Sequence, residues 1–181
     1  MTSLIHLNGP PGIGKSTLAA LYAHRHPGTL NLDIDSLHPL VGGWADEDNH
    51  THEIVRPIAL AMAAAQLRGG RDVILPQYLA RLPEIDKFEQ VAHEERAAFR
   101  EIVLLSGKAE AVARFDRRSD DSEWGQHNRR LVALHGGPAM LASMYDRLLE
   151  ILPARPAAVV IRCEPEAIEA TYALLLEALR A

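Results

Sequence analysis

The chain has 181 residues, 48% of them hydrophobic, and a formal net charge of −5. This length suits one domain with a sizeable core, here residues 1–181. The negative charge disfavours extended nucleic acid as a partner, because proteins that hold it usually present a basic face. The single cysteine, Cys163, provides no disulfide framework, and the longest apolar stretch, residues 58–65, is too short to span a bilayer. We therefore expect a soluble cytoplasmic protein without a membrane partner, either a monomer or a homodimer.

The first pattern along the chain is an apolar run at residues 3–7, a Gly/Pro-rich turn, and a helical pattern at residues 15–26. A G-x-x-x-x-G-K-S sequence between a strand and a helix predicts a phosphate-binding loop. The glycines allow a tight turn whose N–H groups form a nest for anions, and the helix N-terminus adds its positive dipole end. We expect Lys15 to reach the β- and γ-phosphates of ATP and Ser16 to ligate Mg²⁺. The predicted nucleotide-binding residues of the loop are Gly9, Pro10, Pro11, Gly12, Ile13, Gly14, Lys15, Ser16 and Thr17.

A second strand is predicted at residues 29–34, and it carries Asp33 and Asp35 near its carboxyl end. Two residues apart on a strand, their side chains would face the same side. We expect Asp33 to support the metal, directly or through water, and Asp35 to accept the proton of an attacking hydroxyl. The alternative is a solvated turn, where aspartate is common.

A loop at residues 36–49 precedes a long helix that ends at Gly69-Gly70. Thr51 could cap this helix, but Pro57 favours a later start or a kink, because proline fits the first turn better than the interior. A strand at residues 72–75 leads into Pro76 and Gln77, without the acidic residue that many P-loop enzymes carry there.

Several polar residues between positions 38 and 81 are candidates for contacting a substrate. Gln77 could hydrogen-bond a substrate or an ordered water, and Arg81 could meet an anionic group; for both, a polar loop is the alternative. Two further candidates are His38 and Arg56. The histidine pairs His24/His26 and His50/His52 lack Cys or acidic partners at a zinc spacing, so we do not expect zinc.

A helix at residues 82–100 and a strand at residues 101–105 come next, followed by helices at residues 109–118, 126–134 and 138–152. Arg114 and Arg118 lie four residues apart and would share one helix face. Guanidinium groups stack on bases and bind phosphate, so we expect a lid at about residues 115–137 that closes over ATP. Surface arginines at a helix end are the alternative.

A strand at residues 157–162 and a helix from about Pro165 complete the chain. Alternating strands and helices predict a parallel sheet with helices on both faces, joined by right-handed crossovers. Ligands of such sheets bind at the carboxyl ends of the strands, where the phosphate loop, the two aspartates and Gln77 would meet.

The G-x-x-x-x-G-K-S, D-x-D (33–35) and R-x-x-x-R (114–118) sequences together resemble P-loop kinases of the nucleoside-monophosphate-kinase-like group. This group includes adenylate, shikimate and gluconate kinases, chloramphenicol phosphotransferase and the kinase domain of polynucleotide kinase. The resemblance implies a three-layer α/β P-loop NTPase fold, with a five-stranded parallel sheet in the order 2-3-1-4-5 and a helical lid. It also implies ATP and Mg²⁺ as cofactors, Arg114 stacked on adenine, Arg118 as a catalytic residue at the phosphates, and Asp35 as the base.

Two departures from the group affect the predicted acceptor. The arginines with which adenylate kinases bind a nucleoside monophosphate have no clear counterpart, although Arg56 and Arg81 are candidates. Pro76-Gln77 also replaces an acidic strand end. The resemblance therefore favours an ATP-dependent phosphotransferase acting on a hydroxyl of a small molecule, such as an antibiotic or a sugar. The alternatives are a nucleotide or polynucleotide 5′-end kinase, and an ATP-hydrolysing switch without an acceptor, in which Gln77 would position water.

Overall fold

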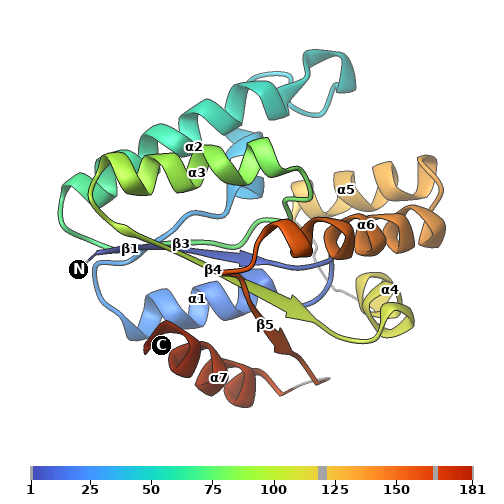
Figure 1. Cartoon of the computed structure of the whole chain (residues 1–181). Helices are drawn as coiled ribbons and strands as arrows, with labels where there is room; N and C mark the ends of the chain where they lie inside the picture. The colour runs from blue at the N-terminus through green and yellow to red at the C-terminus, as the bar shows by residue number, and fades with distance from the viewer. Residues whose placement is uncertain (1, 118–121, 165–166, 181) are drawn as a thin grey trace.

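The computed structural model describes residues 2–117, 122–164 and 167–180. Five parallel strands form one sheet in the order β2-β3-β1-β4-β5 (Figure 1). The strands are β1 (Ser3–Asn8), β2 (Leu30–Asn31), β3 (Val73–Leu75), β4 (Ala98–Leu105) and β5 (Val159–Arg162). The predicted fold class and strand order are thus confirmed.

Seven α-helices and three short 3₁₀ helices connect and flank the strands in the described residues. The α-helices are α1 (Lys15–Arg25), α2 (Thr51–Arg68), α3 (Leu82–Glu94), α4 (Lys108–Arg117), α5 (Glu123–Leu134), α6 (Pro138–Ile151) and α7 (Ile168–Arg180). The 3₁₀ helices are η1 (Ile34–Leu40), η2 (Glu47–Asn49) and η3 (Leu152–Ala154). None of the helices in these residues is long and apolar enough to cross a membrane.

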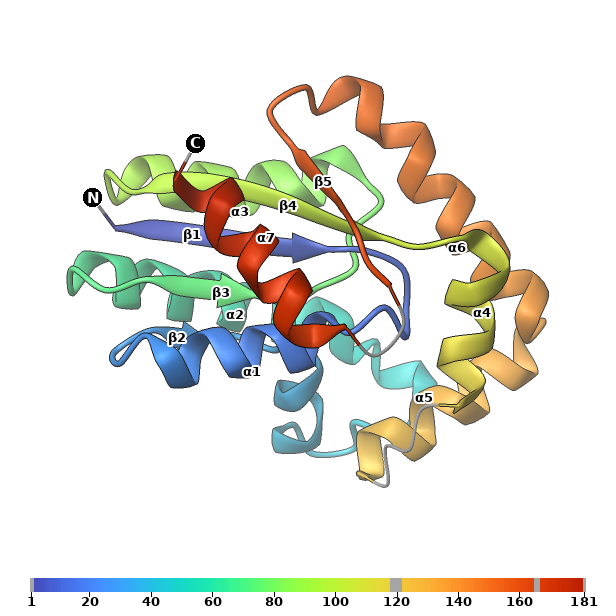
Figure 2. The ribbon, with the colours of Figure 1, turned by 90° about the horizontal axis from the view of Figure 1, so that it is seen from below.

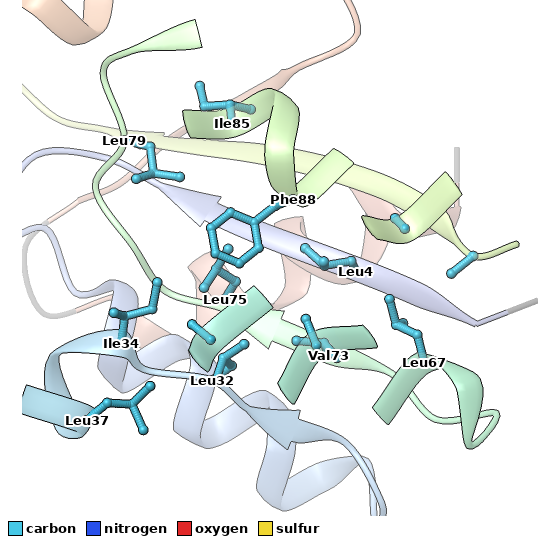
Figure 3. Close-up of a cluster of buried hydrophobic side chains, with 14 of the residues drawn as sticks. Leu4, Leu32, Ile34, Leu37, Leu67, Val73, Leu75, Leu79, Ile85 and Phe88 are labelled. Atoms are coloured by element: carbon cyan, nitrogen blue, oxygen red, sulfur yellow. The ribbon is translucent and has the colours of Figure 1, made fainter. Parts of the chain in front are cut away.

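Helices cover both faces of the sheet. Helices α2 and α3 lie on one face, where Leu4, Val73 and Leu75 of the sheet pack with Ile85 and Phe88 of α3 (Figure 3). Helices α1 and α7 lie on the other face, as the view from below shows (Figure 2). Since both faces are buried, the strands are almost continuously apolar, as is usual for parallel sheets.

Helices α4, α5 and α6 lie together beyond the carboxyl ends of the strands (Figures 1 and 2). Phe115 of α4, Val132 of α5 and Leu141 of α6 form a small apolar core of their own. The described residues of the predicted lid belong to these helices and to the turn between α5 and α6, and Phe115 among them lies next to Gly12 of the phosphate loop.

Three predicted boundaries were wrong. Strand β2 ends at Asn31, so Asp33 is not on a strand; it caps η1 instead. Helix α2 begins at Thr51, so of the two predicted alternatives the later start was wrong. The helix contains Pro57 at an exposed position, where the carbonyl group left without a donor can reach water. Helix α3 ends at Glu94, because Arg96 has a positive φ of 56° and Ala98 already pairs with β1.

Candidate functional site

The phosphate loop joins β1 to α1 through residues 9–14. All three of its glycines have positive φ angles, 148° at Gly9, 82° at Gly12 and 104° at Gly14. A Cβ atom at Gly12 would lie 2.7 Å from the backbone nitrogen of Phe115, so the loop packs directly against α4. A Cβ at Gly14 would meet nothing within 4 Å, which indicates that this residue faces open space.

The Lys15 ammonium lies against its own loop, donating hydrogen bonds to the carbonyl oxygens of Gly9 at 2.8 Å and Pro10 at 3.0 Å. A cavity of about 140 Å³ opens here, lined by Gly12, Gly14, Lys15, Ser16 and Thr17. Because α1 begins at Lys15, the N–H groups of its first turn have no partner within the helix. A helix N-terminus beside a lysine ammonium can hold a phosphate group.

Asp33 lies against Ser16, the residue with which it was predicted to bind the metal ion. Its carboxylate accepts hydrogen bonds from the Asp35 backbone N–H, at 3.2 Å, and from the Ser16 hydroxyl. Burial and the nearby charge of Asp35 raise the pKa of Asp33, although the hydrogen bonds and Lys15 oppose the rise. Both aspartates belong to a capping turn at the start of η1, so the predicted reason for their proximity, a shared strand face, was wrong.

A larger cavity of about 390 Å³, which we call the central cavity, lies between the phosphate loop, α2 and the helices beyond the sheet. Its polar lining residues are Lys15, Ser16, Asp35, His52, Arg56, Gln77, Asn128 and His135. Its apolar lining residues are Pro11, Pro76, Tyr78, Phe115, Trp124, Leu131, Val132, Met140 and Met144, with Gly12 at the loop. The structure thus brings three predicted substrate residues, Asp35, Arg56 and Gln77, to the same cavity as Lys15.

Two predicted substrate residues lie elsewhere. His38 is fully buried, its Nδ1 atom 3.0 Å from the Thr51 hydroxyl, and it is not among the residues that line the central cavity. Arg81 is exposed at the N-cap position of α3, also outside the lining. Short-range sequence position suggested both, but η1 turns His38 inward and the start of α3 turns Arg81 toward solvent.

A third cavity, of about 530 Å³, lies on the other side of the phosphate loop between α4 and the start of α7. Its lining includes Gly12, Ile13, Gly14 and Thr17 of the loop region, and Arg114. The Arg114 Nε atom donates to Glu110 at 3.0 Å, whereas its buried Nη2 atom has no partner. We call it the base-side cavity, because it contains Arg114, which was expected to stack on adenine. The other expected lid arginine, Arg118, lies outside the described residues.

Among the residues of this base-side cavity that the sequence did not predict are Glu110, Arg117 and Cys163. Glu110 binds both Arg114 and Arg117, with 2.8 Å between its Oε1 atom and Nη2 of Arg117. Cys163, a buried residue of the core, also lines the cavity, and burial raises the pKa of its thiol. The Glu110–Arg114 spacing of four residues was a usable signal, since such pairs meet on one helix face.

Five aromatic rings gather where η1, α2 and α5 meet. The Trp124 ring stacks on His38 with 4.0 Å between centroids and 12° between planes, and His52 meets His38 edge-on at 4.5 Å. Trp44 and His127 complete the cluster, 5.1 Å apart. Burial, with His52 nearby, lowers the pKa of His38 to about 4, so the stacked imidazole is neutral at pH 7. This ring cluster fastens α5 to the body of the protein beside the central cavity.

The described residues hold no group of three or more His, Cys, Asp or Glu side chains arranged to bind a metal. Mg²⁺ needs fewer protein ligands, because in phosphate-transferring enzymes it keeps waters and substrate oxygens. Ser16 and Asp33 supply the hydroxyl and carboxylate oxygens that such an ion prefers.

Comparison with known proteins gives a family and a set of similar folds. Residues 4–134 match a family model described as an AAA domain. No curated protein sequence gives a significant match. The structure is similar to that of the tunicamycin resistance protein of Deinococcus radiodurans, with a TM-score of 0.62 and 17% identity over 99% of this chain and 96% of that chain.

Two kinases show the same likeness. A gluconokinase from Sinorhizobium meliloti 1021 has a TM-score of 0.58 and 18% identity, over 99% of this chain and 95% of that chain. The deoxyadenosine kinase of M. mycoides has a TM-score of 0.55 and 14% identity, over 98% of each chain. At these identities the likeness concerns the fold, which is that of P-loop kinases.

Proposed function

The chain belongs to the AAA domain family and has a P-loop kinase fold, and from this premise we propose that it transfers the γ-phosphate of Mg–ATP to a hydroxyl group of a small molecule. One observation carries the proposal: two neighbouring carboxylates have different surroundings. Asp33 is engaged by the Ser16 hydroxyl, whereas Asp35 lines the central cavity beside Lys15. A phosphotransferase with an alcohol acceptor needs these two roles, one carboxylate for the metal and one for the proton.

Ser16 and Asp33 are the residues that would hold Mg²⁺. Burial and the charge of Asp35 raise the pKa of Asp33, so a divalent cation here would relieve the repulsion between the two carboxylates. When bound, the ion neutralises charge on the phosphate oxygens.

The two large cavities on opposite sides of the phosphate loop suit the two substrates. The base-side cavity, with Arg114 in its wall, would take the nucleotide base, and the central cavity would take the acceptor. Gly12 lines both, so the triphosphate would lie along the loop between them, with its γ-phosphate toward Asp35. Lys15 would exchange its two carbonyl partners for phosphate oxygens.

In the transfer step the acceptor oxygen forms a bond to the γ-phosphorus as the bond from that phosphorus to the β–γ bridging oxygen breaks. The proton of the hydroxyl goes to Asp35, and the electron pair of the broken bond leaves on ADP. Lys15 stabilises the negative charge that develops on the phosphates, so positioning and electrostatics account for most of the catalysis.

The test measures ADP production with Mg–ATP alone and with each member of a panel of hydroxyl compounds. Stimulation by an acceptor is expected, and Asp35→Asn should lower kcat by about 10²- to 10⁴-fold while nucleotide affinity changes little. Asp48→Asn is the matched control, because Asp48 also lies in the first turn of a 3₁₀ helix but is outside the central cavity.

Acceptor-independent ADP production that is unchanged in Asp35→Asn would refute the proposal in favour of an ATP-hydrolysing switch. Stimulation by nucleotide or polynucleotide 5′ ends alone would keep the kinase chemistry but replace the acceptor.

A further inference from the structure

The arginine in the wall of the central cavity is already paired with a carboxylate of the protein. Lys15 and Arg56 are the lysine and the arginine that line this cavity among the residues that the structure describes. The Arg56 guanidinium forms an ion pair with Glu84 of α3, whose side chain is 18% exposed. Lys15 lies at the phosphate loop, where the nucleotide phosphates would take it. An anionic group on the acceptor would therefore meet a neutralised arginine and the carboxylate of Asp35.

The rest of the wall favours an acceptor with an apolar body. Phe115, Val132, Met140 and Met144 form part of the lining of the central cavity. Methionine side chains adapt to irregular apolar shapes, so this part of the wall can accept a ring or an alkyl group without a fixed outline.

Two buried polar atoms at the cavity lack partners: the Gln77 Oε1 atom and the Trp124 Nε1 atom. An amide can be rotated so that its nitrogen and oxygen exchange places, but either way one polar end of Gln77 needs a partner. A ligand with neutral donors and acceptors, such as hydroxyl, ether or amide groups, would supply the missing hydrogen-bond partners of both Gln77 and Trp124.

We propose that the acceptor is an uncharged alcohol with an apolar body, and that the Arg56–Glu84 ion pair excludes phosphorylated and carboxylated compounds from the central cavity. This inference rests on the proposed function, because it names the acceptor class of the same site.

The first experiment compares matched acceptors that differ only in charge. Suitable sets keep every hydroxyl: phenyl β-glucuronide with its uncharged methyl ester, and the phenyl glycoside of glucosamine with its uncharged N-acetyl derivative. The neutral member of a set should stimulate ADP production at least about tenfold more, in kcat/KM, than its charged counterpart. Equal or greater stimulation by an anionic or cationic member overturns the inference while leaving the kinase function intact; no stimulation by any compound counts against the function itself.

The second experiment measures binding without turnover, so it decides even if no acceptor is found. Glu84→Gln keeps the shape of the side chain but frees the charge of Arg56. With saturating Mg–ADP present, calorimetry should show phenyl β-glucuronide binding about tenfold more tightly to Glu84→Gln than to the original protein. Glu95→Gln is the matched control, because Glu95 pairs with exposed Arg68 away from the cavity and its loss should change nothing.

Equal glucuronide affinity in the folded Glu84→Gln variant and the original protein would overturn the role of the ion pair. Should Glu84→Gln fail to fold, Glu84→Ser removes the same charge with a smaller side chain and is held to the same result.

Discussion

Replacing Gly12 by alanine should destabilise the protein much more than the same change at Gly14, although the two lie two residues apart in the same loop. Both have positive φ angles, 82° and 104°. They differ in what a Cβ atom would meet: at Gly12 it would overlap the backbone nitrogen and Cα of Phe115 at 2.7 and 2.9 Å, and at Gly14 it would meet nothing within 4 Å.

The magnitudes follow from these two effects. An L-residue in the left-handed region costs about 1–2 kcal/mol, partly offset by about 0.4–1 kcal/mol from the reduced freedom of the unfolded chain. Gly14→Ala should therefore lower the free energy of unfolding by about 1 kcal/mol. Gly12→Ala adds an overlap with backbone that no rotamer change relieves, so α4 must move; overpacking of this kind costs about 1–3 kcal/mol more.

Urea denaturation followed by circular dichroism at 222 nm would measure both changes. Gly28→Ala provides a matched control, since Gly28 has a φ of 93° and the nearest atom to its Cβ would be an arginine Cδ at 3.7 Å. It should behave like Gly14→Ala. Equal losses in Gly12→Ala and Gly14→Ala would refute the close packing of the phosphate loop on α4.

Three further predictions concern buried ionisable groups. Burial lowers the pKa of His6 from 6.5 to about 4, so between pH 6.5 and pH 4 only the unfolded chain binds a proton at this residue. The free energy of unfolding should therefore fall by up to about 3 kcal/mol as the pH drops from 6.5 to 4. Urea midpoints measured against pH should fall less steeply in His6→Asn than in the original protein. Arg155→Met should lower the free energy of unfolding, measured by urea denaturation, by about 3–5 kcal/mol, because Arg155 donates a hydrogen bond to buried Glu101 at 2.7 Å. A loss below about 1 kcal/mol would contradict the importance of this ion pair. Because burial raises the pKa of its thiol, Cys163 should react with Ellman's reagent at pH 8 much more slowly in the native protein than in urea, and equal rates would contradict its burial.

The phosphate loop could be predicted from sequence because all of its parts are consecutive. Glycine positions, the lysine and the start of α1 lie within residues 9–17, so local geometry alone fixes their arrangement. The strand order came from family resemblance, which transfers a topology that no local pattern encodes.

Boundaries that depend on distant pairing were not predictable in the same way. Residues 98–100 continue a helical pattern in the sequence, but they form strand because they pair with residues 3–5 of β1. Helix propensity is a weak preference that such tertiary contacts override.

The central cavity could be predicted only in part. Asp35 and Gln77 follow strands or lie near their carboxyl ends, and the rule for parallel sheets brings those ends together. The contribution of α5 and α6, including Trp124 and Met144, could not be inferred, because it depends on how these helices fold back over the sheet. Likewise, Glu84 has no sequence signal that links it to Arg56, 28 positions earlier.

The ring cluster also gives the protein a built-in optical reporter. The chain has two tryptophans, and both belong to the cluster, with 5.9 Å between the centroids of Trp44 and Trp124. Intrinsic emission excited at 295 nm therefore comes entirely from the junction of η1, α2 and α5. A shift in its wavelength or intensity on addition of a nucleotide or an alcohol would follow movement at that junction in real time, without any attached dye.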